Sequence, residues 1–433
     1  MQKIAVIGAG YVGLVTAAAL AETGNKVLCV DSDTEKIRKL KNGAIPIYEP
    51  GLEKIILKNK NLKRLLFSTN IKEATVSAQI IFICVGTPSR HDGSADLSAV
   101  QKVAQEIARN MKEYKVIVEK STVPAETGEK IKHTIEMNNP GGVAFDVVSN
   151  PEFLREGSAM HDAFHPDRIV IGVESERAEK IMRQLYKPFK APIVATNINT
   201  AELIKHACNS FLATKISFIN AISNICERVN ADVEKVALAM GLDTRIGKEF
   251  LQAGIGFGGS CFPKDVDAFI YLAAQKGYDF ELLKAARKIN QERKDVLLKK
   301  IEEALWIIKD KTIGVLGLSF KPDTDDIRSS VAIDIIKLLL YAGAKVKAYD
   351  PKAMEKARSQ LKGVIFCANP YEVARKSDCV AILTEWQEFR ELDLKKIKKL
   401  LRQPVIIDGR NMFEPQQMHA MGFVYKSIGR RRK

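Results

Sequence analysis

KIAVIGAGYVGLVTAAALAETGNKVLCVDSD, residues 3–33, reads as a strand, a helix and a second strand in succession. The apolar run Ile4–Ile7 is typical of a buried strand, and the alanine-rich segment that continues to Glu22 is typical of a helix. A second apolar run, Lys26–Val30, ends in Asp31. This order predicts a parallel βαβ unit, and therefore a fold of the α/β class.

Three glycines, Gly8, Gly10 and Gly13, form the pattern GxGxxG between the first strand and the helix. There they permit a tight turn and the close approach of a pyrophosphate, to which the helix N-terminus offers N–H donors. The carboxylate of Asp31, 18 residues beyond Gly13, is expected to accept hydrogen bonds from ribose hydroxyls and to repel a 2′-phosphate. We therefore expect NAD rather than NADP, with a βαβ unit that binds another ligand as the alternative.

Three further apolar runs have the character of buried parallel strands, namely Gln79–Val85, Lys115–Glu119 and Val143–Val148. Polar loops follow them and begin with Gly86-Thr87-Pro88, Ser121-Thr122-Val123-Pro124 and Asn150-Pro151-Glu152. Open α/β sheets bind their ligands at the carboxyl ends of their strands. We therefore expect these loops to lie beside bound ligands.

The totals place the chain among ordinary globular proteins. Its 433 residues exceed a single core of the usual size, so two or three domains are expected. No apolar run reaches the roughly 18 residues of a membrane span, and the N-terminus lacks the layout of a signal peptide. Seven scattered cysteines without CxxC pairs or histidines at metal-ligand spacing argue against a disulfide framework and a zinc site. We expect a soluble cytoplasmic protein without a metal, whose cysteines are mostly reduced and buried.

The formal net charge of +15 raises the alternative of a nucleic-acid-binding protein. Part of the excess lies in Lys395–Arg402, KKIKKLLR, and in the terminal Arg430–Lys433, RRRK, which match no nucleic-acid-binding motif. A solvated helix face and a loose tail explain these segments, and the remaining positive charge suits anionic small ligands. We expect neither nucleic acid nor membrane among the partners.

Residues 312–350, TIGVLGLSFKPDTDDIRSSVAIDIIKLLLYAGAKVKAYD, repeat the strand, helix and strand of the first segment, with the helix ending at Gly343. No GxGxxG pattern follows the first strand, and a longer loop carries the charged residues Lys321, Asp323, Asp325, Asp326 and Arg328. We infer a second Rossmann-like domain, whose loop holds a smaller phosphate ligand such as the diphosphate of a nucleotide sugar. Strands at Val380–Leu383 and Val405–Ile407 complete its sheet, and Arg410 follows the second of them.

Residues 200–230 contain neither glycine nor proline and carry an apolar stripe, which predicts one helix of roughly 45 Å. Lys205 and Asn209 stand four residues apart and therefore on one face of this helix. A lysine and an asparagine that face a substrate can stabilise a developing alkoxide. Spacing alone favours an ordinary surface pair. A helical linker is expected over Glu281–Lys309.

The segment GIGFGGSCFPKD, Gly254–Asp265, places Cys261 between a glycine run and a helix predicted over Val266–Gln275, with Pro263 in its first turn. The glycines permit unusual backbone conformations and the close approach of a ligand. A thiol at a helix N-terminus beside Lys264 is expected to have a lowered pKa and to be reactive. Cys261 is therefore the candidate nucleophile, with a buried structural cysteine as the alternative.

Two further polar segments are candidates for the site. In PEFLREG, Pro151–Gly157, a helical turn would place Glu152 and Glu156 on one face, where they either serve a ligand or form the solvated start of a helix. The segment DTRIG, residues 243–247, reads as a polar turn, and Arg245 within it has the character of a surface residue.

These segments together resemble those of the UDP-glucose/GDP-mannose dehydrogenases, a family of nucleotide-sugar 6-dehydrogenases. GFGGSCFPKD resembles the nucleophile loop of that family, and KHACN, residues 205–209, precedes it by some 50 residues as in the family. The resemblance extends over nearly the whole chain. It implies that the protein oxidises UDP-glucose twice at C6, to UDP-glucuronate, through a thiohemiacetal and a thioester on Cys261.

The resemblance also implies roles for particular residues. The catalytic residues are Cys261, Lys205 and Asn209, which stabilise the reacting oxygen, Asp265 and Glu152, which act through water, and Thr122. NAD contacts are implied at Gly8, Gly10, Tyr11, Val12, Gly13, Asp31, Lys36, Thr87, Thr122, Glu156, Lys264 and Arg328. Substrate contacts are implied at Phe153, Leu154, Arg155, Glu156, Gly157, Lys205, Asn209, Arg245, Phe250, Leu251, Gln252, Ala253, Gly254, Gly258, Lys321 and Arg410.

We therefore expect two Rossmann-like doubly wound domains joined by a long central helix. The expected domains are an NAD-binding domain over 1–198, a central helical domain with the cysteine loop over 199–310, and a UDP-sugar-binding domain over 311–433. The central helix is expected to form a homodimer or a larger homo-oligomer. The alternatives are a sister enzyme acting on GDP-mannose or a UDP-N-acetyl-hexosamine, a non-catalytic nucleotide-sugar sensor, and a basic RNA-binding protein.

Overall fold

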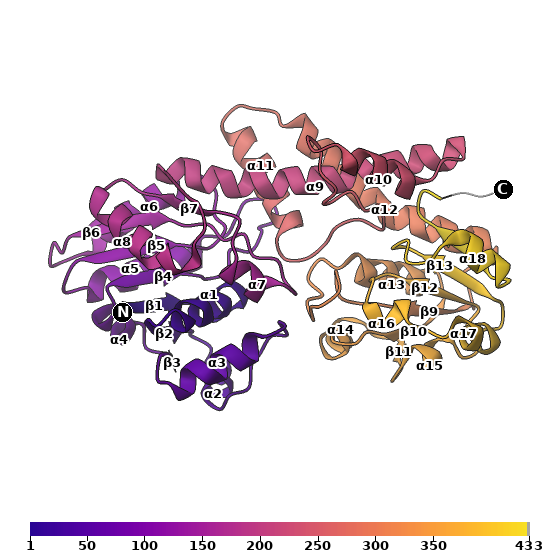
Figure 1. Cartoon of the computed structure of the whole chain (residues 1–433), viewed down its shortest axis with the longest axis horizontal. Coiled ribbons are helices and arrows are strands. Elements are labelled where there is room, and N and C mark those ends of the chain that lie inside the picture. The colour runs from indigo at the N-terminus through magenta and orange to yellow at the C-terminus, as the bar shows by residue number, and fades with distance from the viewer. Residues whose placement is uncertain (431–433) are drawn as a thin grey trace. The chain divides into compact units, whose positions relative to one another are not determined.

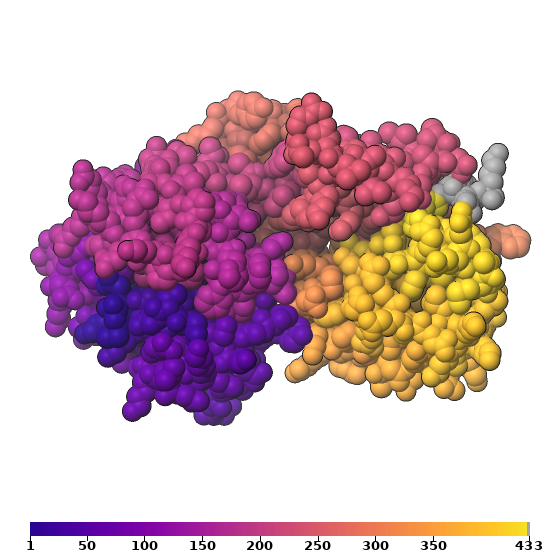
Figure 2. All heavy atoms as spheres, in the orientation of Figure 1, coloured from indigo at the N-terminus to yellow at the C-terminus, as the bar shows by residue number. Residues whose placement is uncertain are grey.

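The structure is a computed structural model that describes residues 1–430 (Figure 1). It divides into two compact units. Unit 1 comprises Met1–Cys208 and Asp267–Tyr278, and unit 2 comprises Asn209–Val266 and the chain from Asp279 onward. In the space-filling view the atoms within each unit pack densely together (Figure 2).

Unit 1 is built on an eight-stranded sheet with the order β3-β2-β1-β4-β5-β6-β7-β8. Neighbouring strands run parallel, except that β6 and β7 pair antiparallel. The first six strands follow the doubly wound order, in which the first strand lies at the centre. The strands are β1 (Lys3–Ile7), β2 (Lys26–Val30), β3 (Leu65–Ser68), β4 (Ile80–Ile83), β5 (Lys115–Glu119), β6 (Phe145–Ser149), β7 (Ile169–Gly172) and β8 (Ile193–Thr196).

Helices cover both faces of this sheet, because its strands are apolar on both sides. One face packs against α1 (Tyr11–Glu22), α2 (Thr34–Lys41), α3 (Leu52–Asn61), α7 (Ala159–Phe164) and α8 (Glu176–Tyr186), which a short 3-10 helix, η1 (Lys187–Phe189), follows. The other face packs against α4 (Ile71–Ser77), α5 (Ser98–Asn110) and α6 (Thr127–Asn138).

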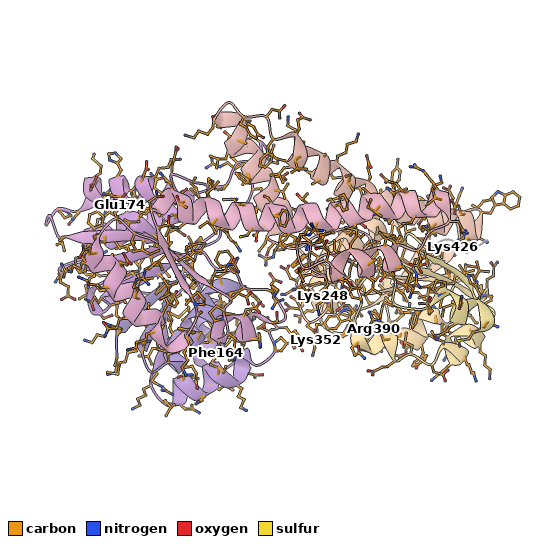
Figure 3. The ribbon with its side chains drawn as sticks, turned by 45° about the horizontal axis from the view of Figure 1, so that its top comes forward. Phe164, Glu174, Lys248, Lys352, Arg390 and Lys426 are labelled. Carbon is orange, nitrogen blue, oxygen red and sulfur yellow. The ribbon has the colours of Figure 1, made fainter. Side chains whose placement is uncertain are left out.

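Two helices continue from one unit into the other. The longer is α9 (Ile198–Val229), with 32 residues, which Figure 3 shows as one straight helix with side chains projecting all along it. The second is α11 (Phe262–Gln275). Unit 2 also contains α10 (Val233–Leu242) and α12 (Glu281–Leu305).

Unit 2 has a six-stranded, wholly parallel sheet with the order β11-β10-β9-β12-β13-β14. Its strands are β9 (Thr312–Leu316), β10 (Lys345–Tyr349), β11 (Val364–Phe366), β12 (Cys379–Ile382), β13 (Val405–Asp408) and β14 (Val424–Ser427). One face packs against α12, α13 (Val331–Tyr341) and α14 (Met354–Gln360). The other packs against α15 (Pro370–Ala374), α16 (Gln387–Arg390), α17 (Leu394–Leu400) and α18 (Pro415–Ala420).

The structure confirms the predicted fold class, since two Rossmann-like sheets are present and a long helix continues from one unit into the other. Two predictions are wrong. The strands at Val380–Leu383 and Val405–Ile407 do not complete the second sheet, which also contains β11 and β14. The helix expected to reach Lys309 ends at Leu305. Trp306 takes a φ of 64° there, which a right-handed helix cannot accommodate. Among the described residues no helix is long and apolar enough to cross a membrane.

The basic segments behave differently from one another. The lysines of α17 are exposed around the buried Ile397, which confirms a solvated helix face. The prediction of a loose tail is wrong for Arg430, whose guanidinium is buried and paired with Asp232 and Glu414. Residues 431–433 of that predicted tail lie outside the described residues. All seven cysteines are free thiols, and five of them are buried, as predicted.

Candidate active site

The turn between β1 and α1 has the sterics of a dinucleotide site. A Cβ added to Gly8, whose φ is 107°, would lie 2.4 Å from Cys84 O, and one added to Gly13 would lie 1.8 Å from Gly8 O. Both positions therefore require glycine for packing within the protein. A Cβ at Gly10 would meet nothing within 4 Å. Gly10 thus leaves open the space through which a pyrophosphate approaches the start of α1.

Asp31 lies at the end of β2 and is tied to this turn. Its Oδ2 accepts hydrogen bonds from Ala9 N at 2.8 Å and from Lys36 Nζ at 2.9 Å, and its Oδ1 accepts one from Asp33 N at 3.0 Å. Burial opposes ionisation of Asp31, but these donors outweigh it and lower the pKa of the carboxyl. The ionised side chain is held in the place where the ribose of a dinucleotide lies in this fold.

Glu49 connects the dinucleotide helix to the PEFLREG segment, and the sequence contained no signal for it. Its carboxylate accepts hydrogen bonds from the Tyr11 hydroxyl, and from Gly157 N and Ala159 N at 2.7 Å each. Glu49 is only 5% exposed. Because its partners lie 38 to 110 residues away in sequence, no local spacing reveals them.

The PEFLREG segment is not helical, so the prediction that a helical turn pairs Glu152 with Glu156 is wrong. Glu152 instead folds back on its own loop, with Oε2 accepting from Leu154 N at 2.5 Å. Such a local bond competes with helix formation. The other oxygen, Oε1, forms a buried ion pair with Lys205 Nζ at 3.0 Å, and that ammonium lies 5.4 Å from the centre of the Phe153 ring. Two predicted catalytic residues of unit 1 are therefore in contact.

A second buried lysine, Lys120, lies close to this pair, and the sequence gave no reason to single it out. Its Nζ donates to Asn150 Oδ1 at 3.0 Å and to Asn150 O at 3.3 Å. Burial lowers the pKa of the Lys120 ammonium to about 8, and the positive charge of Lys205 adds to that effect while Glu152 opposes it. The loop after β5 thus contributes a lysine as well as Thr122.

The predicted loop residues Thr87 and Thr122 are neighbours, since Thr87 Oγ1 donates to Thr122 O at 2.8 Å. These loops follow β4 and β5, which pair in parallel, so both loops lie at the same edge of the sheet. Arg155 departs from this group, because its guanidinium is exposed and bound to Asp162 of α7. Its backbone N–H donates to the same carboxylate, at 2.9 Å.

In unit 2, Cys261 occupies the N-cap of α11, because its carbonyl accepts the first helical hydrogen bond, from Asp265 N at 2.8 Å. Pro263 lies in the first turn, as predicted. The Lys264 ammonium pairs with Asp265 Oδ1 at 2.6 Å, and Asn209 Nδ2 donates to Asp265 Oδ2 at 2.6 Å. Asp265 is fully buried and joins the helix of the thiol to the face of α9 that carries Asn209.

The glycines of the cysteine loop adopt unusual backbone conformations and allow other segments of the protein to pack closely against them. Gly256 and Gly259 do take positive φ values of 97° and 86°. The space that a Cβ would fill, however, is occupied by protein atoms, namely Asn290 Oδ1 at 2.6 Å from Gly256, Ser329 O at 2.2 Å from Gly258 and the Phe320 ring at 2.7 Å from Gly259. Neighbouring segments of unit 2 therefore approach these three glycines closely, and the approach of a ligand to their backbone stays a prediction.

Two side chains of α12 hold the same loop. Asn290 exchanges two hydrogen bonds with the backbone of Phe257, at 2.8 and 3.0 Å. Arg293, which is 1% exposed, donates from Nε to Gly254 O at 3.0 Å and from Nη1 to Asn224 Oδ1 at 2.8 Å. Burial lowers the pKa of the Arg293 guanidinium to about 10. The loop before Cys261 is thus fixed from within unit 2.

The predicted residues of the second Rossmann-like domain gather at the carboxyl ends of its strands. Arg410, which follows β13, donates to Leu383 O at 2.8 Å and to Gly256 O at 3.4 Å, and so contacts the cysteine loop. Lys321 follows Phe320, whose ring its ammonium approaches to 5.8 Å. Arg328 is exposed and forms a bidentate pair with Asp326.

The remaining predicted substrate residues of unit 2 do not share one environment. Arg245 is exposed and paired with Asp243, just beyond α10. Leu251 and Ala253 are buried, Gln252 is exposed, and Phe250 takes a positive φ of 65°. That conformation is rare for a bulky residue and marks this segment as tightly constrained.

Comparison with known proteins assigns a family to each part of the chain. Residues 2–190 match the NAD binding domain of the UDP-glucose/GDP-mannose dehydrogenase family, residues 199–292 its central domain, and residues 314–415 its UDP binding domain.

Individual relatives agree with this match. The chain is 52% identical over 431 residues to the UDP-glucose 6-dehydrogenase TuaD of Bacillus subtilis (strain 168), covering 99% of this chain and 94% of that protein. A UDP-glucose dehydrogenase from the hyperthermophilic archaeon Pyrobaculum islandicum has a similar structure, with a TM-score of 0.93 at 39% identity over 98% of this chain and 97% of that one. A UDP-D-ManNAc dehydrogenase from Pyrococcus horikoshii gives a TM-score of 0.89 at 29% identity, over 99% of each chain.

The open space at Gly10 and the ionised Asp31 fit a bound NAD, the cofactor of the family's first domain. With three domains matched in order and half of its residues shared with a relative of nearly equal length, the chain belongs to the UDP-glucose/GDP-mannose dehydrogenase family and is an NAD-dependent dehydrogenase.

Proposed function

We propose that the protein oxidises UDP-glucose twice at C6, to UDP-glucuronate, through a covalent intermediate on Cys261. The observation that carries the proposal is the placement of Cys261 at the start of α11, one turn before a buried Asp265 that Asn209 and Lys264 both contact. A thiol at a helix N-terminus is favoured as thiolate. The identity to UDP-glucose 6-dehydrogenases supports the choice of substrate.

The first oxidation needs a group that stabilises the oxygen at C6 as its proton is lost. Lys205 and Asn209 stand one turn apart on α9 and supply an ammonium and an amide N–H. Glu152, paired with Lys205 at 3.0 Å, is placed to act through a water as the proton acceptor. Bound NAD supplies the hydride acceptor in each of the two oxidations.

The second oxidation follows from the chemistry of a thiolate. Cys261 Sγ adds to the C6 aldehyde, and the oxygen takes up a proton to give a thiohemiacetal. Loss of a hydride and a proton converts this adduct into a thioester. A water positioned by Asp265 and Glu152 then attacks the thioester carbon, and Cys261 leaves as a thiolate. The aldehyde thus remains attached to the protein between the two oxidations.

The proposal is tested by measuring NADH formation with a panel of nucleotide sugars. UDP-glucose should give two NADH per sugar consumed. Preference for GDP-mannose or for a UDP-N-acetyl-hexosamine would indicate a sister enzyme. The similarity to a UDP-D-ManNAc dehydrogenase is the reason for testing that alternative. Binding of a nucleotide sugar without any NADH would favour a sensor.

Asp31 should set the preference for NAD. In Asp31→Ala the acceptor for the ribose hydroxyls and the negative charge facing a 2′-phosphate are both lost. We expect the KM for NAD to rise about tenfold and the ratio of kcat/KM for NAD to that for NADP to fall by more. Steady-state kinetics with each cofactor measure this ratio. Equal use of both cofactors by the unmutated protein would contradict the assignment.

Lys321 should serve the sugar nucleotide and not the cofactor. We propose that its ammonium binds the diphosphate, so Lys321→Ala should raise the KM for UDP-glucose about tenfold and leave the KM for NAD unchanged. Arg410 is proposed for the same ligand, but it also holds Gly256 O, so its removal would disturb the cysteine loop as well. An equal rise in both KM values for Lys321→Ala would argue against this role.

We further propose that the chain works as three functional domains, with boundaries at 1–198, 199–310 and 311–433, and that it forms a homodimer or a larger homo-oligomer through α9. Phe211, Phe218 and Ile225 recur every seven residues on α9 and are 66%, 48% and 51% exposed. Such a stripe suits a second helix. Because the nucleophile must remain a thiol, we place the enzyme in a reducing compartment, the cytoplasm.

A further inference from the structure

The first turns of α9 hold the segment that carries Thr122. Asn199 Oδ1 accepts from Glu126 N at 3.1 Å, and His206 Nε2 donates to Val123 O at 2.9 Å. Both contacts lie within unit 1, on either side of Lys205 in the sequence of α9. The loop after β5 is therefore attached to the helical turns that carry a proposed catalytic lysine.

Glu202 makes the central contact of this group. It is 2% exposed, and its Oε1 accepts a hydrogen bond from Gly128 N at 2.7 Å, beside the backbone N–H groups of Glu126 and Thr127. The carboxylate therefore caps the N-terminus of α6, where a negative charge is favourable. A Cβ on Gly128 would lie 2.4 Å from Ile198 Cγ2 and 3.4 Å from Glu202 Oε1, so the first turn of α6 is pressed against α9.

We propose that Glu202 is a positioning residue, whose ionised carboxylate holds the Thr122 segment against the turn of α9 that carries Lys205. The inference rests on the proposed role of Lys205 and on the role that the family resemblance implies for Thr122. It adds a residue that does not touch the reacting atoms and acts through the backbone it binds. Glu202 precedes Lys205 by three residues, so a shift of the loop relative to α9 changes the place of Thr122 relative to the ammonium.

The charge of Glu202 is sensitive to pH near neutrality. Burial raises the pKa of its carboxyl to about 7, although the N–H groups of residues 126–128 lower it, and the negative charge of Glu129 on α6 raises it further. Glu119, at the end of β5, is the other buried acid nearby, and Lys205 and His206 are the charged or titratable neighbours on α9 itself. Protonation leaves a weaker acceptor for Gly128 N and removes the negative charge beside the N–H groups of Glu126 and Thr127.

The test compares Glu202→Gln, Glu202→Ala and the control Glu126→Gln. Glutamine keeps an acceptor oxygen and loses the charge, so kcat with UDP-glucose at pH 8 should fall about fivefold, and alanine should lower it about ten- to hundredfold. The inflection near pH 7 in the kcat profile of the unmutated enzyme should be absent from the glutamine variant. Glu126, which is exposed and paired with Lys276, belongs to the same segment, and its variant should keep the full profile.

A thermal measurement separates positioning from general support of the fold. The folded-state pKa of Glu202 lies above its ordinary value, so this carboxyl contributes stability that is lost as pH rises from about 4.5 to about 7. The stability contribution of glutamine does not depend on pH in this way. The Tm of Glu202→Gln minus the Tm of the unmutated protein should therefore be larger at pH 8 than at pH 5. A variant that is relatively more stable at pH 8, and yet slower, is the expected signature of a positioning residue.

Three outcomes would overturn the proposal. They are an unchanged kcat and pH profile in Glu202→Gln, the same losses in Glu126→Gln, and a loss of kcat that follows a parallel loss of Tm and NAD affinity. If Glu202→Ala does not fold, the glutamine variant decides. If instead the proposed function is wrong, the unmutated protein will form no NADH from UDP-glucose. The comparison of Tm values would still test the contact between Glu202 and α6.

Discussion

Replacing Cys261 by alanine should abolish formation of the sugar acid while leaving NAD binding intact. Without Sγ no thiohemiacetal can form, so the second oxidation loses the covalent adduct from whose C6 the hydride departs. The unmutated enzyme should form two NADH for each UDP-glucose consumed and release no aldehyde. Liquid chromatography of the sugar nucleotides, together with NADH absorbance, measures both quantities.

The serine variant provides the matched comparison. Cys261→Ser keeps the size of the side chain, but its hydroxyl is a weaker nucleophile and the resulting ester has a poorer leaving group. Turnover should fall by roughly three orders of magnitude or more, which corresponds to about 4 kcal/mol in activation free energy. An ester-linked sugar on this variant should be visible by intact-protein mass spectrometry. If Cys261→Ala still makes the acid with two NADH at a near-normal rate, the cysteine is structural and the mechanism is wrong.

Replacing Lys205 by methionine should lower kcat by about 10² to 10³, because the oxygen at C6 loses its charged donor. The same change should destabilise unit 1 by about 3–5 kcal/mol, since it leaves the carboxylate of Glu152 buried without its ammonium partner, 3.0 Å away. Steady-state kinetics and urea unfolding measure the two effects separately.

A double variant distinguishes these two effects. In Lys205→Met with Glu152→Gln, neither member of the pair is charged, so most of the lost stability should return while kcat stays low. The exposed pair of Lys132 and Glu174 offers a control, because Lys132→Met should change unfolding by less than about 1 kcal/mol and leave kcat unchanged. Recovery of activity together with stability in the double variant would show that Lys205 and Glu152 both matter only for folding.

Much of the fold was predictable because its determinants are local. Runs of apolar residues located the strands of both βαβ units and several others, whereas β3, β7, β8, β11 and β14 were not predicted. The GxGxxG turn located the first βαβ unit, whose strand β2 begins and ends at the predicted residues. Gly8 and Gly13 are required by sterics within a few residues of their own turn or on the adjacent strand. The start of α11 followed from Pro263 for the same reason, since its fixed φ suits the first turn of a helix.

Part of the site was equally local. The spacing of Lys205 and Asn209 follows from helical geometry, and the position of Cys261 before Pro263 follows from the preferences of a helix start. The conformation of PEFLREG did not follow. A spacing of four residues between two acids is compatible with a helix, but Glu152 satisfies the N–H of Leu154 instead and directs its other oxygen to α9.

By itself the sequence determined the class of fold, the strands of the two βαβ units, the dinucleotide turn and the candidate nucleophile, because each depends on runs of apolar residues or on backbone sterics over a few residues. Only the tertiary structure decided which groups the buried charged side chains contact. Glu49 reaches Gly157 across 108 residues, Glu202 reaches Gly128 across 74, and Lys120 approaches the Glu152 pair from a different strand. Such pairs form because a buried charge needs a partner, and packing, not spacing, determines which partner is near.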